Sequence, residues 1–350
     1  MESRTGFSRN RLEALLTKIR DVRVVLIGDM GLDVYWRADM TRSELSRETP
    51  HFPLPIVEET CLPGAGGNVA ANLAALRPSS VHVLSVIGRD WRGDILSRLL
   101  QDSGLDISGL VVSQAAVTPA YCKPRRFGFG DLVYEDPRLD FANFSDLPPQ
   151  DEQSLLANLD RCITTADIVC VADQFRFGCI TTAVRERLCA YGRAGVTVVA
   201  DSRDRIGLFT DIILKPNEIE CCRAVGQIAD PSHTDLARCS QAARLLAECN
   251  QAKVCLTLGA AGSLYTDGAQ AVHVPAPRVQ PPLDICGAGD TFLAAFACAL
   301  AAGALPGEAA ALANLASAVT IRKIGVTGTA SPEEIIACHR QMIDQKDHRS

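Results

Sequence analysis

The sequence of 350 residues lacks an apolar run long enough to cross a bilayer, lacks a C-x-x-C pair and contains only six histidines. Its first residues, MESRTGFSRNRLEALL, also lack the apolar core of a signal peptide. We therefore expect no membrane span, no structural zinc site and a cytoplasmic location. The net charge of −6 gives no reason to expect a nucleic acid or a membrane surface as partner, and it is compatible with a small polar substrate.

Cysteine, in contrast, is abundant, with fourteen residues. Many lie inside apolar runs, as Cys170 does in ADIVCVAD and Cys255 in AKVCLTLG. Buried cysteines behave as small apolar residues. The sequence therefore predicts free thiols in a reducing compartment rather than disulfides.

Apolar runs of strand length alternate with amphipathic segments along the chain. The predicted strands lie in VRVVLIGD, HVLSVIGRD, DIVCVAD, TVVADSR, IILKPN and KVCLTLG, and the predicted helices in RLEALLTKIR, NVAANLAAL, WRGDILSRLLQDSG, TTAVRERLCAYGRAG and ARLLAECN. This alternation predicts an α/β fold with a parallel sheet covered on both faces. We expect residues 1–350 to form a single domain.

Two polar, proline-containing stretches, residues 34–58 and 111–143, interrupt the alternation. Their short alternating runs predict antiparallel strands outside the main sheet, which together could form one lid. An exposed lid of this kind could also pair with a second copy, so we expect a homodimer through the lid.

The segment DICGAGDTF precedes a long apolar helical pattern. Gly287, Ala288 and Gly289 would let backbone N–H groups approach a ligand, and the helix start adds positive potential there. Asp290, in the first turn, could accept a proton from an attacking hydroxyl. A helix cap is the structural alternative for this aspartate.

Three further motifs follow predicted strands or open predicted helices. LPGAGGNVAANLAAL contains a glycine-rich turn that does not fit the G-x-G-x-x-G spacing of a dinucleotide fold, which argues against a nicotinamide dehydrogenase. In LKPNEIE, Asn217 and Glu220 suit a hydrated Mg²⁺ beside phosphates, or else cap a helix. In LTLGAAGSL, Thr257, Gly259 and Gly262 allow close approach of a nucleotide, or else form a β-hairpin.

In this order, the segments PGAGGNVAANLAAL, IGRDWRGD, KPNEIE, TLGAAG and DICGAGDTF resemble ribokinase/PfkB-type carbohydrate kinases. Within that family, VVLIGDMGLDVYW, SRETPHFPLPIVEE, CKPRR and PRLDF are most similar to D-glycero-β-D-manno-heptose-7-phosphate kinases. The resemblance implies a three-layer ribokinase-like fold with a small antiparallel β lid, and transfer of a phosphoryl group from ATP to a sugar. Such enzymes often carry a fused nucleotidyltransferase domain, and because the sequence ends at Ser350 we expect that activity to be absent.

The resemblance also implies roles at matching positions. Asp290 would be the base, and Gly287, Ala288 and Gly289 the anion hole. Asp33, Gly64 and Asn68 would hold the sugar. The residues implied along the ATP site are Asn217, Thr257, Gly259, Gly262 and Asn314. Glu220 and Asn217 would place Mg²⁺, and Asp284 is implied in a site for a monovalent cation such as K⁺.

Basic residues of the lid allow two interpretations. Lys123, Arg125 and Arg126 could bind the phosphate of a sugar phosphate, because guanidinium groups match phosphate geometry, or could form a solvated basic face. Arg138 and Glu48 are further candidates.

The sequence departs from the family pattern at three places. Ala65 and Arg77 stand where glycine is usual, and ADQFRFG (172–178) replaces a shorter loop containing Tyr and Lys. This loop leaves the acceptor open, so another sugar, a sugar phosphate or a nucleoside remains an alternative. A binding protein that kept the fold without the reaction is the alternative from another class.

Overall fold

A long, mostly parallel sheet forms the centre of the molecule. The computed structural model describes residues 2–3, 8–128, 130–229, 234–325 and 327–347. Within these residues the strands of the main sheet follow the order β1-β15-β14-β13-β12-β11-β10-β2-β5-β6, and only β13–β14 and β14–β15 pair antiparallel. The strands are β1 (Glu2–Ser3), β2 (Arg23–Gly28), β5 (Ser80–Gly88), β6 (Asp106–Ser113), β10 (Ile168–Asp173), β11 (Val198–Ser202), β12 (Ile213–Leu214), β13 (Lys253–Thr257), β14 (Ser263–Thr266) and β15 (Ala271–Val274).

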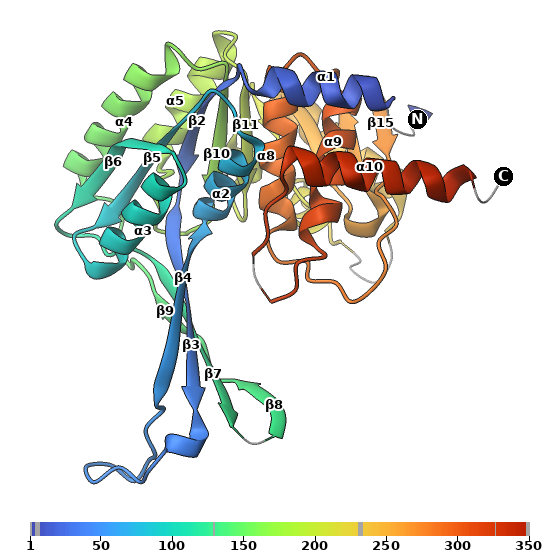
Figure 1. Cartoon of the computed structure of the whole chain (residues 1–350). Helices are drawn as coiled ribbons and strands as arrows, with labels where there is room; N and C mark the ends of the chain where they lie inside the picture. The colour runs from blue at the N-terminus through green and yellow to red at the C-terminus, as the bar shows by residue number, and fades with distance from the viewer. Residues whose placement is uncertain (1, 4–7, 129, 230–233, 326, 348–350) are drawn as a thin grey trace.

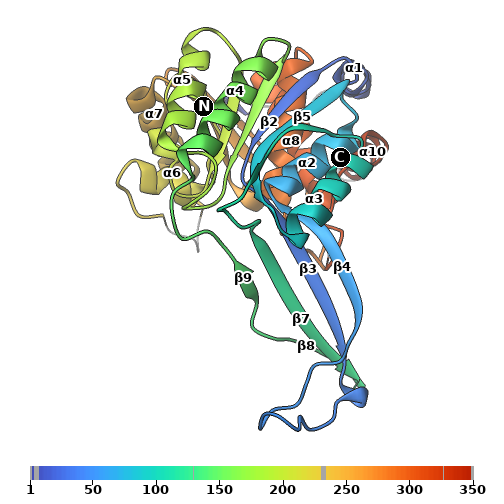
Figure 2. The ribbon, with the colours of Figure 1, turned by 90° about the vertical axis from the view of Figure 1, so that its left-hand side faces the viewer.

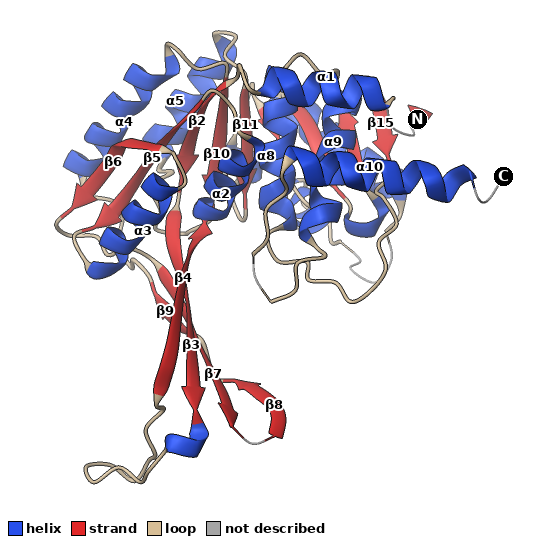
Figure 3. Ribbon diagram, in the orientation of Figure 1, coloured by secondary structure: helices blue, strands red, loops and turns tan. Residues whose placement is uncertain are grey.

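Helices cover both faces of this sheet (Figures 1 and 3). One apolar cluster packs helices against the first face: α1 (Arg9–Ile19), α2 (Gly66–Leu76), α3 (Trp91–Asp102), α8 (Ala288–Ala301), α9 (Pro306–Thr320) and α10 (Pro332–Asp347). A second cluster packs the others against the opposite face: α4 (Pro149–Ile163), α5 (Thr182–Arg193), α6 (Glu218–Ala224) and α7 (Leu236–Asn250). Short 3-10 turns are η1 (Met40–Arg42), η2 (Ile206–Leu208) and η3 (Gly259–Ala261). The predicted three-layer α/β architecture is confirmed.

The central strands owe their position to continuous apolar sequence. Every residue of β10 is buried, and all of β2 after Arg23 is buried, as expected of parallel strands covered on both sides. Helix α8 is similarly apolar on nearly all sides, and it is buried from Thr291 to Ala299 between the sheet and the neighbouring helices. Each predicted strand and helix is present, with α7 longer than expected.

A second, small sheet projects from the carboxyl edge of the main sheet, as Figure 2 shows. It contains β3 (Met30–Asp39), β4 (Ile56–Ala65), β7 (Ala120–Gly128), β8 (Gly130–Glu135) and β9 (Leu139–Phe141). Two details of the predicted lid are wrong. Residues 111–113 complete β6 of the main sheet, and β3 pairs with β7 in parallel, so the small sheet is mixed rather than antiparallel.

The two residues that stand where the family usually has glycine, Ala65 and Arg77, both have a positive φ. Ala65, just before α2, has φ 50°, and Arg77, just after α2, has φ 59°. Glycine adopts this region without a steric cost, whereas a residue with Cβ does not. Both ends of α2 therefore keep a backbone shape that favours glycine.

The fourteen cysteines are all unpaired, which confirms the prediction of free thiols. Ten of the fourteen are buried, including Cys170 and Cys255, and burial raises the pKa of the Cys298 thiol to about 12. In the part of the chain that the structure describes, no helix has the length and apolarity required to cross a membrane.

Candidate active site

Adjacent parallel strands bring acidic residues to one edge of the main sheet. The register places Gly28 beside Ala172, and Ala172 beside Asp201. Asp29 and Asp173 therefore follow at the ends of β2 and β10, next to Ser202 at the end of β11. The carboxyl edge of an open α/β sheet is where ligands bind.

The predicted glycine-rich turn opens helix α8 at this edge. Gly287 is the N-cap with φ 76°, and the N–H groups of Gly287, Gly289 and Asp290 have no protein acceptor among the described residues. The N–H of Ala288 donates to the carbonyl of Ile285 at 3.2 Å, so it is already used within the turn. The unpaired N–H groups at this helix start suit an anion.

Asp290 lies half-buried in the first turn of α8, and the side chain of Asn68 in α2 lies close enough to its carboxyl group to lower the pKa of Asp290. Burial and the charge of Asp201 raise the pKa of Asp290 to about 7, against the opposing effects of Lys215 and Asn68. A carboxylate whose pKa lies near neutrality is suited to accept a proton in catalysis. The structure thus brings two predicted residues, Asp290 and Asn68, close together.

A buried lysine that the sequence analysis did not single out completes this centre. The Nζ of Lys215 lies 3.0 Å from Oδ2 of Asp201, and 3.8 Å from the position a Cβ on Gly289 would take. Burial lowers the pKa of Lys215, but the charges of Asp201, Glu220 and Asp290 raise it above its usual value. A permanent cation therefore lies beside the N–H groups of the α8 turn.

The motif K-P-N was visible in the sequence next to Asn217. Its lysine, Lys215, lies at the end of the predicted strand IILKPN, where ligand-binding residues are expected, and this position was the available signal.

Asn217 and Glu220 form a capping box at the start of α6. The side chain of Asn217 accepts from the N–H of Glu220 at 2.9 Å, and Glu220 accepts from the N–H of Asn217 at 2.8 Å. Burial and the charge of Asp201 also raise the pKa of Glu220. The helix cap predicted as the alternative role is therefore present. It holds the Glu220 carboxylate near enough to Asp201 and Lys215 for their charges to affect its pKa.

The donor set fits a hydrated Mg²⁺ that phosphates help to hold. Asp201 raises the pKa of both Glu220 and Asp290, so negative charge accumulates where a divalent cation would relieve it. Across the described ranges, no three His, Cys, Asp or Glu side chains converge to hold a metal by themselves. Mg²⁺ commonly keeps several waters and binds through one or two carboxylates plus phosphates.

The other predicted nucleotide residues lie at the end of β13 and beyond. Thr257 forms a bridge with Asn217, which brings these two predicted residues together. Gly259, with φ 53°, has open space where a side chain would be, whereas a Cβ on Gly262 would lie 2.2 Å from the carbonyl oxygen of Val274. The hairpin β13–β14 is present, so the structural alternative holds at Gly262.

Asn314 is buried in α9, where its Nδ2 donates to Oγ of Ser263 at 3.1 Å and to the carbonyl of Val274 at 3.0 Å. These bonds join α9 to β14 and β15. The Asn314 amide nitrogen is therefore used within the fold, and a role for this residue near adenine stays a prediction.

In the small sheet, Asp33 and Lys123 form a pair on neighbouring strands. Lys123 Nζ lies 3.1 Å from Oδ1 of Asp33 and 3.1 Å from the hydroxyl of Tyr35. Burial lowers the pKa of Lys123, but the Tyr35 hydrogen bond and the Asp33 charge raise it overall. The backbone at Gly64 packs directly against Asp33. Both charges of the pair also influence Cys286, so the pair lies toward the α8 turn.

The predicted basic cluster of the lid is neutralised from within. Arg125 pairs with Glu135 at 3.1 Å, Arg126 with Asp136 at 2.7 Å, and Arg138 with Asp140 at 2.6 Å. Each of these three cations thus has an acidic partner in the small sheet, and binding of a substrate phosphate by Arg125, Arg126 or Arg138 stays a prediction.

Arg203, in contrast, is an arginine without a side-chain partner among the described residues. It follows Ser202 at the end of β11 and is exposed. Its charge influences the carboxyl groups of Asp290 and Glu220 and the phenol of Tyr121 in β7. The unpaired guanidinium of Arg203 therefore lies near groups of both the main sheet and the small sheet.

Asp284, the implied monovalent-cation residue, uses both oxygens in the fold. They accept from the N–H of Cys286 and from the N–H of Gly325, each at 3.0 Å. These bonds, led by that of Cys286, lower the pKa of Asp284 and keep it ionised. Its part in a cation site stays a prediction.

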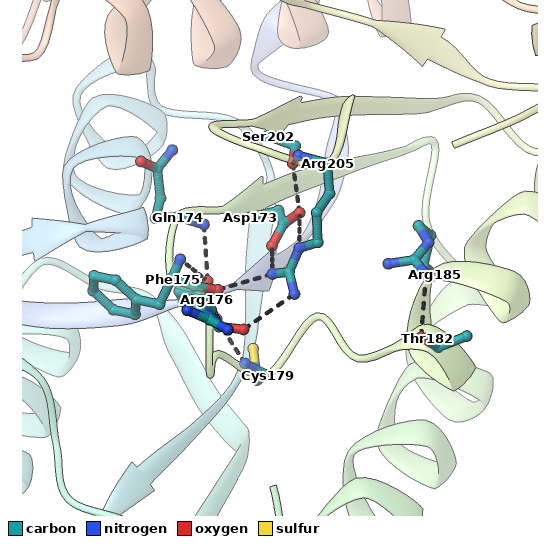
Figure 4. Close-up of polar contacts among 10 residues, drawn as sticks. Asp173, Gln174, Phe175, Arg176, Cys179, Thr182, Arg185, Ser202 and Arg205 are labelled. Carbon is teal, nitrogen blue, oxygen red and sulfur yellow. Dashed lines mark hydrogen bonds and ion pairs between the residues drawn. The ribbon is translucent and has the colours of Figure 1, made fainter. Parts of the chain in front are cut away.

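The loop 174–179, which departs from the family pattern, is held by two acidic residues that the sequence analysis missed (Figure 4). The buried carboxylate of Asp29 accepts from its N–H groups, and Arg205, paired with Asp173, donates to the carbonyl of Phe175 at 2.8 Å. Burial and the charge of Asp173 raise the pKa of Asp29 to about 6. Both aspartates stood at strand ends in the sequence, which was the available signal.

Comparison with known proteins gives the class and then the family. Over 91% of this chain and 98% of the other, the fold is similar to Arabidopsis thaliana ribokinase, solved with ribose and ATP (TM-score 0.67, 21% identity). Over 92% and 99%, it is similar to Escherichia coli phosphofructokinase-2, solved with potassium (TM-score 0.71, 19% identity). Fold and site thus define a ribokinase-like α/β protein with a mostly parallel sheet and a smaller second sheet.

Over part of its length the chain is similar to the pfkB family of carbohydrate kinases. Residues 208–334 match the family model described as pfkB family carbohydrate kinase. The bifunctional protein HldE of Geotalea uraniireducens is 31% identical over 333 residues, and that of Citrifermentans bemidjiense is 32% identical over 338 residues. Each alignment covers 94% of this chain, but the chain spans only 65% and 66% of the two relatives.

The raised pKa of Asp290 predicts a pH-dependent stability. An aspartate whose pKa is higher in the folded than in the unfolded state contributes stability that is lost as pH rises from about 4 to about 7. Asp290→Asn removes this loss, so at pH 8 the variant should be more stable than wild type, by about 4 kcal/mol at most. At pH 4 the two proteins should be nearly equal. Urea unfolding at both pH values measures the difference.

Asp167→Asn is the control with the opposite sign. The hydrogen bond from Arg23 lowers the pKa of Asp167, so its stabilisation is present above about pH 4 and lost in acid. This variant should be destabilised at pH 8. A destabilised Asp290→Asn protein at pH 8 would contradict the proposed burial cost of the Asp290 charge.

Proposed function

We propose that this protein transfers the γ-phosphoryl group of ATP to a hydroxyl of a sugar or sugar phosphate, with Asp290 as the base. The observation that carries the proposal is the start of α8, where three unpaired N–H groups and the Lys215 ammonium flank a carboxylate with a pKa of about 7. Phosphoryl transfer requires a group that accepts a proton and a group that stabilises negative charge.

In the proposed reaction Asp290 accepts the acceptor's hydroxyl proton while that oxygen bonds to the γ-phosphorus. The bond from this phosphorus to the β–γ bridging oxygen breaks, and ADP leaves. The N–H groups of Gly287 and Gly289, with Lys215, stabilise the charge on the transferring group. Mg²⁺ held near Glu220 would neutralise phosphate charge. Thr257 and Gly259 would line the nucleotide side, and the small sheet would exclude water from the reacting groups.

For the acceptor, we propose D-glycero-β-D-manno-heptose 7-phosphate, converted to the 1,7-bisphosphate. The long similarity to HldE proteins supports this choice over other pfkB substrates. The Asp33–Lys123 pair offers polar groups of both signs to sugar hydroxyls, and Gly64 and Asn68 lie beside it and beside Asp290, respectively. Because the basic residues of the lid are paired, Arg203 is the better candidate for the acceptor's phosphate than Arg125 or Arg138.

An acceptor panel tests the substrate. We expect kcat/KM for D-glycero-β-D-manno-heptose 7-phosphate to exceed that for ribose, fructose 6-phosphate, a ketoacid sugar and a nucleoside by at least tenfold, measured by ADP release. Mass spectrometry should find the bisphosphate. A different preferred sugar would refute the heptose assignment alone. Binding of ATP and sugar without any product would instead favour a non-catalytic regulator.

Asp290→Asn tests the base. Its turnover on the preferred acceptor should fall by about 10²–10⁴-fold, the usual contribution of a general base, while calorimetry should find ATP binding retained. An amide cannot accept the hydroxyl proton at neutral pH. Unchanged turnover would exclude Asp290 as the base.

The pH profile provides a separate test. Because Asp290 must be ionised, kcat/KM should fall on the acid side with an apparent pKa near 7. Asp201→Asn removes a neighbouring negative charge, so this acid limb should move to lower pH. The matched control is Asp204→Asn, which removes an exposed carboxylate from the turn that follows β11 and should leave the limb in place. A limb that does not move in Asp201→Asn would contradict the assignment of the limb to Asp290.

We also propose that two copies associate through the small sheet. Strand β4 is an edge strand, and its residues 56–60 are all exposed. Exposed apolar side chains on the small sheet include Ile56, Val57, Leu132, Val133 and Tyr134. An exposed apolar edge favours pairing with another chain.

Replacing Val57 by Lys places a charge on this edge. The variant should sediment with a smaller mass than wild type at equal micromolar concentration, because the charge must be desolvated on pairing. Leu245→Lys, at an exposed apolar residue of α7 outside the small sheet, is the control and should not change the mass. A monomeric wild type would refute the dimer.

A further inference from the structure

Asp29 is a buried carboxylate whose oxygens accept three backbone hydrogen bonds from one loop. Its Oδ2 accepts from the N–H groups of Gln174 at 2.8 Å and Phe175 at 2.7 Å, and its Oδ1 from the N–H of Cys179 at 2.7 Å. Asp29 is 3% exposed. Three such bonds to a charged acceptor fix the course of the loop 174–179.

The backbone of Asp29 holds a second turn. Its carbonyl accepts from the N–H of Gly66 at 2.8 Å, and its own N–H donates to the carbonyl of Ala172 at 2.9 Å. Gly66 is the first residue of α2, two positions before Asn68, which contacts Asp290. One residue therefore sets the loop 174–179 and the glycine-rich turn relative to each other.

Close packing leaves this arrangement little freedom. A Cβ on Gly178 would lie 2.2 Å from Oδ1 of Asp29, so glycine is required at that position. From the other side, Arg205 donates to the carbonyls of Phe175 and Arg176, at 2.8 and 3.3 Å. Backbone donors and acceptors of the loop are thus both held by buried or half-buried side chains (Figure 4).

Two side chains of the loop, those of Gln174 and Phe175, point away from this network. Figure 4 shows Gln174 and Phe175 directed to the side opposite Arg205, and Gln174 has no side-chain hydrogen bond among the described residues. The ring of Phe175 packs edge-on against Tyr121 of β7, with centroids 6.3 Å apart. Tyr121 in turn lies under the guanidinium of Arg138, 4.2 Å from its ring centroid. The loop is therefore the place where the main sheet meets the small sheet.

We infer that Asp29 is a positioning residue for the acceptor side of the site: it holds Gln174 and Phe175 as the wall against which the sugar lies, in register with Asn68. This inference rests on the proposed kinase function. It adds to that function a pair of specificity-determining side chains and the buried group that fixes them.

The test compares two isosteric replacements. Asp29→Asn turns an oxygen that faces N–H groups into an N–H donor. Asn250→Asp is the matched control, because the buried Asn250 amide donates to the carbonyls of Gly207 and Phe209, and the replacement faces them with an acceptor. In Asp29→Asn a donor therefore faces backbone N–H donors, and in Asn250→Asp an acceptor faces backbone carbonyl acceptors. Both changes lie at a buried side chain that holds a loop.

In Asp29→Asn we expect the KM for the sugar acceptor to rise at least tenfold and the KM for ATP to stay within twofold. In Asn250→Asp both KM values should stay within twofold, even though the melting temperature falls to a similar extent. An acceptor KM that is unchanged in Asp29→Asn, or raised equally in both variants, would overturn the inference.

Two more variants act on the same contact without removing the carboxylate. Gly178→Ala pushes against Oδ1 of Asp29 and should raise the acceptor KM, and the double variant with Asp29→Asn should lose less than the two single losses combined. Phe175→Leu leaves the anchor intact and should raise the acceptor KM several-fold with a normal melting temperature. If Asp29→Asn does not fold, an unchanged acceptor KM in Phe175→Leu overturns the inference.

The wild-type enzyme separates the two proposals. A wild type that phosphorylates no acceptor of the panel refutes the proposed function, and the inference with it. If the wild type is active but the acceptor KM of Asp29→Asn is unchanged, or rises equally in Asn250→Asp, the inference alone is refuted.

Discussion

The parallel register of β2, β10 and β11 is the constraint on which the candidate site depends. Because Gly28, Ala172 and Asp201 lie side by side, the residues that follow emerge together at one edge of the sheet. Asp29 then reaches the loop after β10, Asp173 reaches Arg205 after β11, and Asp201 reaches Lys215 after β12. Each acid at a strand end thus links its own strand to the next connection along the sheet, and the contacts between loops follow from the pairing of strands.

Concentrated negative charge is the second property of this edge. Burial and the charge of Asp201 raise the pKa of both Glu220 and Asp290, with Lys215 as the buried counter-charge. Such an arrangement costs folding free energy, since buried like charges repel and lose hydration. Proteins commonly place such costs at functional sites. In the proposed function, the same charges would provide a base with a pKa near neutrality and a place for a cation that binds together with phosphates.

Structural and chemical explanations of one residue do not exclude each other in this molecule. Asn217 and Glu220 form a complete capping box, and in doing so they hold the Glu220 carboxylate near Asp201. Asp290 stands in the first turn of α8, where an acidic residue complements the helix dipole, and it also meets Asn68. Gly262, by contrast, is explained by the hairpin, because a side chain there would collide with Val274.

Local sequence patterns were enough to predict the alternation of strands and helices, the carboxyl edge as the place of the candidate site, and the motifs that carry Asp290, Asn68, Asn217 and Glu220. They suffice because periodicity and glycine spacing act over a few residues. Which charges are paired, in contrast, depends on contacts between distant segments of the folded chain. Arg125, Arg126 and Arg138 find acidic partners within the small sheet, whereas Arg203 finds none among the described residues. The anchoring by Asp29 was equally invisible, because it joins residues about 145 positions apart, which only the pairing of β2 with β10 brings together.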